Sequence, residues 1–346
     1  MKLLSVAVPC YNVEPYLEKC LSSFCGEGLE DALEVLIVDD GSQDKTAEIA
    51  RGFVAQHPEI FRLIEKENGG HGSAVNAGID AAAGKYFRIV DGDDWVDTGA
   101  LGDFLRRLAD TDTDLVVDQK TRVDLVTGTK RFISLPAEIP FGKPVSSLDY
   151  SGDALCLFYS LHTVTVRTSL LKEHDIRLQE HCFYVDNEYL LKSMAYSSYV
   201  TFYNLDVYRY LVGNQNQSVS HQSYVKRYGQ HERVIKECLR FAAREEWPPA
   251  LRAYMRRRIL PLLRTHFLIA LVYNENRAQG EQNAKAFWTF LQRDYPSYAR
   301  AGARRRRLSW LLHRLGFNDE RLERLKKRPH YAKSYSRRDS MPEIYL

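Results

Sequence analysis

The segment EVLIVDDGSQDKTAEIARGFVAQ, residues 34–56, decides the fold class of this chain. It opens with a short apolar run ending in two carboxylates, Asp39 and Asp40, which is the pattern of a buried strand that reaches a sheet edge. A Gly-Ser turn follows, and Asp44 then stands where a helix N-cap is expected. A buried strand followed by a helix is the repeating unit of an α/β sheet covered by helices.

The same order of strand, loop and helix recurs through the first part of the chain. Apolar runs predict further strands over residues 3–9, 61–65 and 85–91, and an Ala-rich segment predicts a helix over residues 73–83. In open α/β sheets, ligands bind in the crevice outside the carboxyl ends of the strands. We therefore expect the polar residues that follow these strands to share one binding site.

The pattern changes twice further along the chain. Residues 112–150 show shorter β segments with Pro and Gly between them, and the C-terminal third is helical, basic and aromatic without strand signals. We therefore predict a mixed α/β domain over residues 1–222, with halves at 1–97 and 98–222. A mainly helical region is predicted over residues 223–346.

Composition separates these regions by charge. The 346 residues are 45% hydrophobic with a net charge of +3, but residues 225–346 hold about 28 Lys and Arg against about 12 Asp and Glu. No uninterrupted apolar run reaches the roughly 18 residues of a membrane-spanning helix, and Pro9 interrupts any signal-peptide core. The six cysteines form no CxxC pair, which favours reduced thiols over a zinc site or a disulfide framework. We expect a cytoplasmic protein without a cleaved leader.

The sequence DGDD, residues 91–94, is the sharpest chemical motif. A buried strand delivers Asp91, Asp93 and Asp94 at its carboxyl end, and Gly92 permits the backbone to bend between them. Carboxylates arranged in this way bind hard divalent cations such as Mn²⁺ or Mg²⁺. An isolated motif of this kind is more often an acidic turn in which an Asp caps the next helix, so its neighbours must decide.

Three other strand ends supply those neighbours. Residues 39–42 present carboxylates suited to a nucleobase or ribose, and residues 8–12 place an aromatic ring and an amide in the same crevice. The glycine-rich loop at residues 67–73 precedes a helix, where backbone N–H groups can approach phosphate. Each has an alternative explanation as turn chemistry, but their order and spacing together favour a nucleotide site.

Three successive segments carry a resemblance to a known family. SVAVPCYNVEPYLEKCLSSF (5–24), VLIVDDGSQDKTAEI (35–49) and ENGGHGSAVNAGIDAAAGKYFRIVDGDDWVD (67–97) resemble the signatures of glycosyltransferase family 2, whose members have the GT-A fold. The resemblance is close over residues 3–97 and looser up to about residue 220. It implies a nucleotide-sugar donor, usually a UDP or dTDP sugar, one bound divalent metal, and inversion at the anomeric carbon.

The resemblance also implies roles for individual residues. Asp91 and Asp93 would form the metal-binding DxD, with Asp93 as the more direct ligand. Residues 1–97 would bind the nucleotide sugar, and residues 98–222 would bind the acceptor. The donor would contact Pro9, Tyr11, Asn12, Glu14, Asp40, Asn68, Gly70, His71, Asp91 and Gly92.

The chain departs from the family pattern at one donor-binding position. Many members carry Arg before the Asn of an A-R-N-x-G segment, whereas this chain has Val75 before Asn76. Contacts to the diphosphate must then come from another residue, for which His71 is a candidate. The identity of the donor is correspondingly open.

Inversion needs a general base on the acceptor side, within reach of the attacking hydroxyl. The family's acidic pair matches HCFYVDNEYLLKS, which puts Asp186 at the catalytic position and Val185 in place of the first acid. We favour Asp186 over Glu188 as the base. Asp186 could equally cap the helix that follows, a role compatible with catalysis.

Histidines are weaker candidates. His221 follows QSVS near the point where many GT-A enzymes complete the metal site with a histidine, so it is a possible third ligand beside Asp91 and Asp93. As a lone histidine, it is more often a structural residue. His162 and His181, near the acceptor region, have still less support.

The segment RRRRLSWLLHRLGF, residues 304–317, sets leucines and a tryptophan beside an arginine cluster. An amphipathic helix of this type suits peripheral contact with the inner face of the cell membrane, where a lipid-linked acceptor would lie. The alternative is an ordinary packed helix with solvated charges. Nucleic-acid binding is not expected, because no recognition motif accompanies the basic residues.

We therefore expect an inverting glycosyltransferase that uses a divalent metal and an Asp base, most often found in bacterial surface polysaccharide or glycolipid synthesis. Two alternatives remain. A nucleotidyltransferase that makes nucleotide sugars has a similar fold, but its Gly-rich, Arg- and Lys-bearing loop is absent after the first strand, where VPCYN stands. A catalytically silent nucleotide-sugar-binding module is the other, and the intact DGDD argues against it.

Overall fold

A computed structural model describes residues 2–150, 159–213, 221–244 and 246–326. These residues form two compact units, an α/β unit that ends at residue 213 and a helical unit that begins at His221. His221 opens helix α7 (His221–Lys226) and stacks on Tyr273 of the helical unit. The predicted boundary after residue 222 falls inside this helix, and the predicted domain ranges stay predictions.

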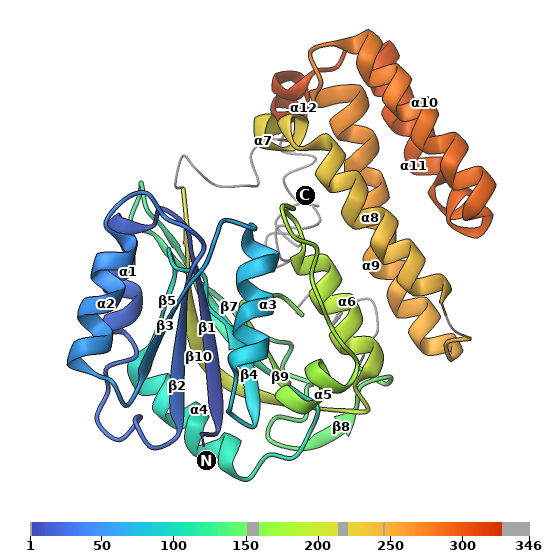
Figure 1. The fold of residues 1–346 in the computed structure, drawn as a ribbon. Coiled ribbons are helices and arrows are strands. Elements are labelled where there is room, and N and C mark those ends of the chain that lie inside the picture. The colour runs from blue at the N-terminus through green and yellow to red at the C-terminus, as the bar shows by residue number, and fades with distance from the viewer. Residues whose placement is uncertain (1, 151–158, 214–220, 245, 327–346) are drawn as a thin grey trace. The chain divides into compact units, whose positions relative to one another are not determined.

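The α/β unit contains one mixed sheet flanked by helices (Figure 1). In chain order its elements are β1 (Leu4–Cys10), α1 (Glu14–Ser22), β2 (Leu33–Asp39), α2 (Thr46–Gln56), β3 (Phe61–Glu65), α3 (His71–Ala81), β4 (Tyr86–Ile89), β5 (Trp95–Val96), α4 (Thr98–Ala109), β6 (Leu115–Asp124), β7 (Lys130–Ile133), β8 (Pro144–Ser146), β9 (Val164–Arg167), α5 (Thr168–Glu173), α6 (Asp186–Tyr196) and β10 (Tyr199–Val212). The predicted α/β class is confirmed. β3 coincides with its predicted range, while α3 starts two residues earlier than expected.

The strand order is β3-β2-β1-β4-β9-β6-β10-β5, with β7 beside β6 and β8 beside β10. β1 pairs in parallel with β2 and β4, and β2 pairs in parallel with β3. β9 is antiparallel to both β4 and β6, so it joins the parallel half to the half formed by β6 and β10. The carboxyl ends of β1, β2 and β4 therefore lie at one sheet edge, as the motif spacing predicted.

Side chains of β1 alternate between two packed faces. Leu4, Val6 and Val8 join the core that contains the buried residues of α1 and α4, and each contributes about 1.5–3 kcal/mol by full burial. Ala7 faces α3, where a Cβ added at Gly78 would come 2.6 Å from the Ala7 Cβ. Glycine at this position lets α3 approach the sheet closely, on the side opposite α1 and α2 (Figure 1).

The helical unit confirms the predicted helical region, and no strand occurs among its described residues, 221–244 and 246–326. After α7 it contains α8 (Tyr228–Ala243), α9 (Pro249–Leu268), the π-helical turn η1 (Ile269–Tyr273), α10 (Arg277–Asp294), α11 (Pro296–Arg314) and α12 (Asp319–Lys326). A Cβ at Gly280 would lie 2.0 Å from the Ala270 carbonyl oxygen, so α10 and η1 meet backbone to backbone. Inside the unit, Nδ1 of His231 and Nδ1 of His266 are 3.1 Å apart, and both rings are buried.

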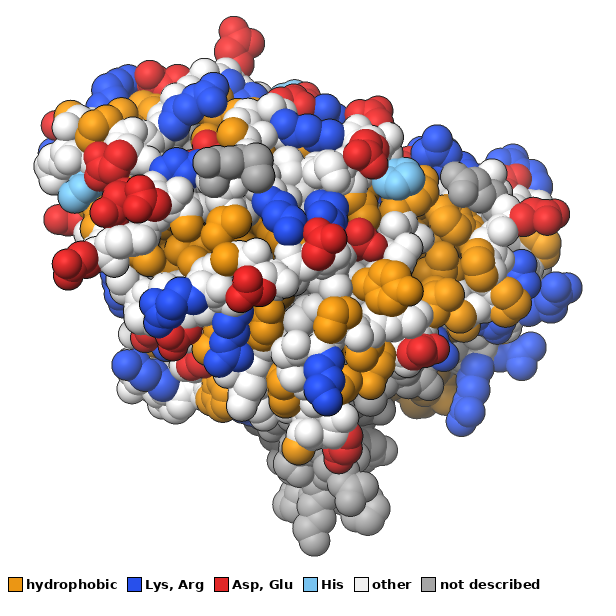
Figure 2. All heavy atoms as spheres, turned by 90° about the horizontal axis from the view of Figure 1, so that it is seen from below, with side chains coloured by type: hydrophobic (Ala, Val, Ile, Leu, Met, Phe, Trp, Pro, Cys, Tyr) orange, Lys and Arg blue, Asp and Glu red, His pale blue; other side chains and the backbone are white. Residues whose placement is uncertain are grey.

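None of the helices in the described part of the chain combines the length and the apolar character that crossing a membrane requires. On the face shown in Figure 2, acidic and basic side chains are interspersed with hydrophobic ones. This face therefore carries no continuous patch of purely acidic or purely basic side chains.

Candidate active site

The acidic motif lies directly after β4 and forms a tight turn. The Asp94 N–H donates to the Asp91 carbonyl (2.9 Å), and the Gly92 N–H donates to the Pro9 carbonyl (3.3 Å). A Cβ added at Gly92 would come 3.1 Å from the Pro9 oxygen. Glycine is thus needed for the close approach to β1, and its φ is not in the left-handed region, so close packing and not the predicted bend explains this residue.

Asp94 is the anchored member of the motif. Its carboxylate accepts hydrogen bonds from the Tyr208 hydroxyl (2.5 Å) and the Leu211 N–H (2.7 Å), and it is buried. Burial, with the nearby charges of Asp93 and Asp91, raises the pKa of Asp94 well above its usual value. Asp94 therefore ties the motif to β10.

Asp91 pairs with the first residue of α3. Nε2 of His71 lies 2.9 Å from the Asp91 Oδ1. Burial lowers the pKa of His71, but the hydrogen bond to Asp91 and the charges of Asp91 and Asp186 outweigh it and raise the pKa. The structure thus brings together two predicted donor-site residues, His71 and Asp91, as a hydrogen-bonded pair.

Asp93 carries a destabilised charge. Burial and the neighbouring charge of Asp91 raise its pKa to about 6. A divalent cation between two such carboxylates would relieve their repulsion, and oxygen ligands are those that Mn²⁺ and Mg²⁺ prefer. Asp91 and Asp93 therefore fit the predicted metal.

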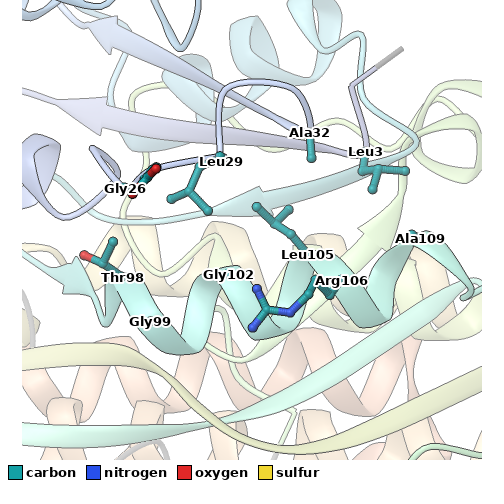
Figure 3. Close-up of a pocket in the computed structure, with 12 residues that line it drawn as sticks. Leu3, Gly26, Leu29, Ala32, Thr98, Gly99, Gly102, Leu105, Arg106 and Ala109 are labelled. Atoms are coloured by element: carbon teal, nitrogen blue, oxygen red, sulfur yellow. The ribbon is translucent and has the colours of Figure 1, made fainter.

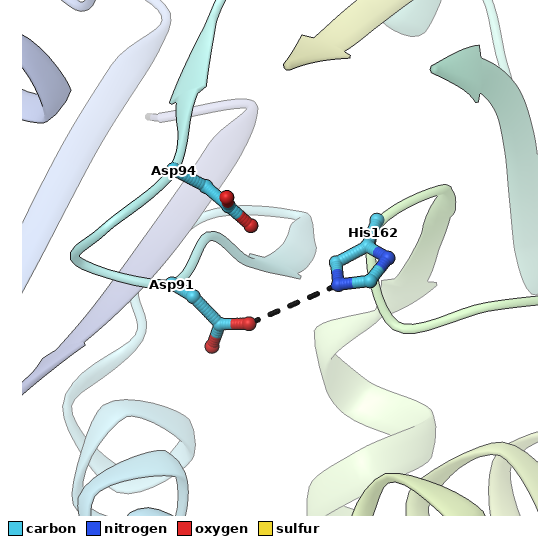
Figure 4. Close-up of side chains that lie close together, drawn as sticks. All are labelled: Asp91, Asp94 and His162. Carbon is cyan, nitrogen blue, oxygen red and sulfur yellow. Dashed lines mark ion pairs between the residues drawn. The ribbon is translucent and has the colours of Figure 1, made fainter. Parts of the chain in front are cut away.

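A second set of potential ligands surrounds the same aspartate. The ligand atoms of Asp91, Asp94 and His162 lie within 4.8 Å of one another (Figure 4), and among the described residues this is the group of three that could hold an ion. Nε2 of His162 is 3.9 Å from the Asp91 Oδ2. Asp93 is not part of this group, so the geometry differs from the predicted trio of Asp91, Asp93 and His221.

His221, the predicted third ligand, lies in the helical unit. Its Nδ1 forms an ion pair with Asp319 (2.5 Å), and its ring stacks on Tyr273 at 4.1 Å. These contacts give it a structural role at the start of α7. Its role as a metal ligand stays a prediction.

Asp40 organises the glycine-rich loop that precedes α3. Its carboxylate accepts hydrogen bonds from the N–H groups of Gly69 (2.9 Å) and Gly70 (2.7 Å) and pairs with Lys66 Nζ (2.8 Å). The Asn68 side chain donates to the Asp40 carbonyl (2.9 Å). Both residues thus shape the loop, and their predicted contacts with the nucleoside stay predictions.

Gly70 is the N-cap of α3 and has a φ of 85°, the left-handed region that favours glycine. A Cβ there would also approach the His181 backbone N at 3.3 Å. Any other residue at position 70 would strain the start of α3. The turn thereby places His71 beside Asp91.

The loop after β1 is tied to the loop after β2. Asn12, with a φ of 53°, donates from its N–H to Ser42 Oγ (3.0 Å) and accepts from the Gln43 N–H (2.8 Å). Glu14 accepts from the Lys45 N–H (3.0 Å). Asn12 and Glu14, both predicted to border the base and ribose, thus hold the edges of this region together.

Tyr11 stands out between these bonded residues, because its side chain is 51% exposed while the preceding strand is fully buried. An exposed ring at a strand end can stack on a planar base. Pro9 is buried in β1 and reaches the site only through its carbonyl, which accepts from Gly92. The predicted nucleoside role is thus better matched by Tyr11 than by Pro9.

The two candidate bases occupy different surroundings at the start of α6. Asp186 is the first residue of the helix, is partly exposed, and its charge raises the pKa of His71. Glu188 is fully buried, accepts a hydrogen bond from the Gln179 side chain, and lies 3.6 Å from Lys192 Nζ. The geometry therefore favours Asp186 as the residue that meets a substrate.

Contacts between α3 and the segment before α6 hold Asp186 at the site. Asn76 makes two hydrogen bonds of 2.9 Å with the backbone of Leu178, one through each end of its amide. A Cβ at Gly72 would lie 2.2 Å from the Gln179 carbonyl oxygen, so the two segments touch. Val75, at the position where the family often has Arg, is fully buried.

Sequence reasoning missed the buried charges behind the site. Arg88 of β4 forms a fully buried ion pair with Asp118 of β6, and its Nη2 donates to the His162 carbonyl (2.6 Å). Lys120 Nζ lies 2.9 Å from His162 Nδ1. The sequence did contain a signal for this network. Arg88 lies inside the apolar run 85–91, and Asp118 and Lys120 lie inside a β segment. Because buried charges need partners, these residues could have been expected to pair.

A hollow in the α/β unit lies away from these residues. It has a volume of about 510 Å³ and sits between α4 and the residues that precede β1 and β2, such as Leu3, Leu29 and Ala32 (Figure 3). Those residues lie at the amino ends of the strands, whereas the acidic motif follows the carboxyl end of β4. The hollow is therefore separate from the candidate active site.

Comparisons with known proteins concern the α/β unit and its fold. Residues 5–174 match the family model described as glycosyl transferase family 2. A 94-residue segment is 46% identical to the uncharacterized glycosyltransferase EpsJ of Bacillus subtilis (strain 168), covering 27% of each chain. The chain thus matches about a quarter of the length of this curated relative.

Two solved structures share the architecture over most of the chain. Staphylococcus aureus TarS 1–349 in complex with UDP-GlcNAc is 23% identical, with a TM-score of 0.65 over 92% of this chain and 93% of that chain. The mannosyltransferase PcManGT from Pyrobaculum calidifontis, in complex with GDP-Man and Mn²⁺, is 16% identical, with a TM-score of 0.57 over 97% and 84%.

The mixed sheet with an acidic motif after β4 is the GT-A fold, as the sequence predicted. Residues 5–174 of this α/β unit thus form a glycosyltransferase family 2 domain.

Proposed function

We propose that this chain is an inverting glycosyltransferase that moves a sugar from a nucleotide diphosphate donor to an acceptor hydroxyl. The observation that carries this proposal is the convergence of Asp91, Asp93, His71 and Asp186 at the carboxyl edge of the sheet. Two aspartates suit a metal, the histidine suits a phosphate, and the last aspartate suits an acceptor proton. All four residues are needed for metal binding, phosphate binding and proton acceptance together.

Asp91 and Asp93 would hold the divalent metal, and the raised pKa of Asp93 reflects its burial and the neighbouring charge of Asp91. When bound, Mn²⁺ or Mg²⁺ would neutralise the diphosphate oxygens. The N-terminus of α3 adds a positive helix end on the same side. His71, whose pKa is raised beside Asp91, is suited to donate a hydrogen bond to a phosphate oxygen.

Asp186 would act as the general base. The acceptor oxygen attacks the anomeric carbon, its proton passes to the Asp186 carboxylate, and the bond from that carbon to the diphosphate oxygen breaks. The attacking and leaving oxygens stand on opposite faces of the sugar, so the configuration inverts in one step. Asp186 needs only to reach the acceptor hydroxyl, within about 2.6–3.2 Å in the bound complex.

We propose a UDP sugar as the donor. The TarS neighbour was solved with UDP-GlcNAc, and the more distant mannosyltransferase was solved with GDP-Man and Mn²⁺. Tyr11 offers a ring for the base, and Asn12 and Glu14 frame it. The acceptor is proposed to be a saccharide or a lipid-linked saccharide.

Contact with a membrane surface is a further part of this proposal. Leu308 and Leu311 of α11, and Leu315 directly after it, are each more than half exposed, and they are the exposed large hydrophobic residues of the described helical unit. Arg304 and Arg307 are exposed on the same helix. Leucines beside arginines suit the interface of an anionic bilayer, where lipid-linked acceptors reside.

A donor panel tests the assignment. Thermal stability and donor hydrolysis would be measured with UDP-, dTDP- and GDP-sugars, with and without Mn²⁺, on the wild type, Asp93→Ala, and Asp103→Ala as an exposed carboxylate control on α4. One sugar nucleotide should stabilise the wild type and Asp103→Ala only with Mn²⁺, and Asp93→Ala should lose this effect. Binding of none of the donors would remove the proposal, and synthesis of a nucleotide sugar from a triphosphate would favour a nucleotidyltransferase.

The stereochemical part needs a separate readout. NMR of the first product would show inversion, for example a β linkage from an α-linked donor sugar. A product that retains the donor configuration would exclude the single-step mechanism. Donor binding without turnover on any acceptor, and without any effect of Asp186→Asn, would favour a silent binding module.

A further inference from the structure

His162 is held in place by three different elements of the α/β unit. Arg88 of β4 donates from Nη2 to its carbonyl (2.6 Å), and Nζ of Lys120 on β6 lies 2.9 Å from its Nδ1. The ring stacks on Tyr210 of β10 at 4.2 Å between centroids. Only 16% of the His162 side chain is exposed. The position and the rotation of the ring are therefore both determined.

The contact with Lys120 fixes which ring nitrogen carries hydrogen. A lysine ammonium can only donate, so Nδ1 of His162 must be the acceptor. A neutral imidazole has one N–H, which must then be on Nε2. Nε2 is the nitrogen that faces Asp91, 3.9 Å from its Oδ2 (Figure 4).

The contact with Lys120 also requires a neutral ring. A doubly protonated imidazole has no lone pair on Nδ1 and could not accept a hydrogen bond from the ammonium at 2.9 Å. The ring therefore carries a single N–H rather than two.

We propose that Lys120 is a positioning residue that presents the Nε2–H of His162 to Asp91, so that His162 is a hydrogen-bond donor beside the metal site and not a metal ligand. A nitrogen that bears hydrogen has no lone pair for a cation, however close it lies to Asp91 and Asp94. Nε2 is 3.9 Å from the Asp91 Oδ2, beyond direct hydrogen-bonding distance, so its N–H faces the carboxylate and stays available to an oxygen of the donor. The cation is left to Asp91 and Asp93.

This inference gives the donor site a second source of positive potential and rests on the proposed function for its role in turnover. His71 approaches Asp91 through Oδ1, and His162 approaches it through Oδ2. The ammonium of Lys120 stands behind the second histidine, in a site where Val75 is buried and supplies no charge. An anionic oxygen of the donor can accept the same Nε2–H when it binds next to Asp91.

Imidazole ¹⁵N NMR tests the positioning without any substrate. Long-range ¹H–¹⁵N spectra of the wild type should show His162 as the Nε2–H tautomer, and Lys120→Arg should retain that pattern. Lys120→Met removes the donor but keeps the aliphatic stem, so His162 should shift toward a tautomer mixture. His174, an exposed histidine stacked on Tyr196, should be unchanged in every variant and reports correct folding. An Nδ1–H tautomer in the wild type would overturn the proposal.

Metal affinity supplies the second arm. Mn²⁺ binding in the presence of UDP would be followed by electron paramagnetic resonance for the wild type, His162→Gln and Asp93→Asn. His162→Gln should change the Mn²⁺ affinity by less than about threefold, whereas Asp93→Asn should lower it on the order of tenfold or more. A loss in His162→Gln as large as in Asp93→Asn would make His162 a ligand and overturn the proposal.

Turnover separates this inference from the proposed function. Lys120→Met should lower kcat about tenfold while the donor KM changes little, and Lys120→Arg should restore most of the rate. A wild-type protein without transferase activity would defeat the proposed function but leave the tautomer and Mn²⁺ results to decide the role of Lys120. An unchanged tautomer in Lys120→Met would show that Lys120 does not position the ring.

Discussion

The catalytic edge of the α/β unit and the interior of the helical unit treat ionisable groups in opposite ways. At the sheet edge, Asp93 is held partly exposed beside Asp91 with a raised pKa. In the helical unit, His231 and His266 are buried against each other, and Glu232 lies 3.7 Å from His266 Nε2. The first arrangement leaves charge that a ligand can satisfy, whereas the second pairs the two rings with each other and sets Glu232 beside them. The difference separates the residues that we propose to act on substrates from residues that stabilise the fold.

The substitution Asp186→Asn should have the largest effect on turnover. It also tests the contrast between active and structural residues within one helix, because α6 carries both Asp186 and the buried Glu188. Asp186→Asn removes the acceptor for the substrate proton, so kcat should fall about 10²–10⁴-fold while donor binding and Mn²⁺-dependent stabilisation persist. Steady-state kinetics and thermal shift with the donor that the panel identifies would measure both.

Glu188→Gln is the matched control. Glu188 is buried beside Gln179 and Lys192, so its exchange should lower the free energy of unfolding by about 1–3 kcal/mol. The kcat of the folded fraction should stay near the wild-type value. If Glu188→Gln abolished turnover and Asp186→Asn did not, the assignment of the base would be reversed.

The buried pair behind the site offers a stability test of the same contrast. Arg88→Met leaves the Asp118 carboxylate buried without its partner and releases the His162 carbonyl, so unfolding should become about 3–5 kcal/mol easier. Urea denaturation of the α/β unit would measure this change. The double variant Arg88→Met with Asp118→Asn should regain part of the loss, because no buried charge remains unpaired. A loss below about 1 kcal/mol would show that the pair contributes little.

The fold was predictable because its signals are local. The strand that became β3 and the strand end at Asp39 follow from runs of apolar residues, and Gly70 precedes a helix as loop chemistry requires. Each of these features depends on residues within a few positions of itself. The location of the site followed from strand order alone, since parallel strands end at one edge.

The roles within the site were harder to predict because they depend on distant partners. Asp93 and Asp94 are adjacent and chemically alike. The carboxylate of Asp94, however, accepts a hydrogen bond from Tyr208 of β10, which lies more than 100 positions away in the sequence. Asp40 resembles a ligand residue in sequence, but its partners are the amides of the next loop. His162 gains its interest only from Lys120, which sits in a segment of weak pattern. These contacts could not be predicted because the partners lie far apart in the sequence.

Acidification should weaken the helical unit more than a single surface histidine could explain. Burial lowers the pKa of both His231 and His266, so the unfolded chain takes up protons more readily than the folded one. Stability is therefore present above pH 6.5 and should fall by about 1.4 kcal/mol per pH unit for each histidine as the pH drops below that value. Glu232 opposes the shift of His266, and Tyr228, Tyr224 and Lys236 are the other polar or charged groups that face the pair.

Tryptophan fluorescence would follow this transition, because Trp247, Trp288 and Trp310 all belong to the helical unit. Denaturation would be compared at pH 7.5 and pH 5.5 for the wild type and for His266→Phe, which keeps an aromatic ring against Tyr228 and Phe287. The variant should show a smaller pH dependence. Equal dependence in both proteins would mean that the buried pair does not control the acid stability of this unit.

The smallest effect on the isolated protein is expected from two exposed leucines at the C-terminal end of α11, Leu311 and its C-cap Leu315. If they bind a membrane surface, the comparison between the units breaks, because the helical unit would then do more than stabilise the fold. Leu311→Ser combined with Leu315→Ser removes side chains that are 52% and 59% exposed, so unfolding should change by no more than about 0.5 kcal/mol. Turnover on a water-soluble acceptor should be unaffected. Each leucine inserted into a bilayer interface should contribute about 1 kcal/mol, as should each arginine near anionic lipid.

Sedimentation with vesicles of neutral and anionic composition distinguishes these contributions. The leucine variant and a variant with Arg304→Gln and Arg307→Gln should both lose binding to anionic vesicles, and only binding that depends on the arginines should weaken as salt rises. Leu125→Ser, at a residue 49% exposed in the α/β unit, is the matched control and should bind as the wild type does. If all variants bound equally, or if none bound, the exposed face of α11 would be an ordinary solvated surface. The helical unit would then be a packing element without a lipid partner.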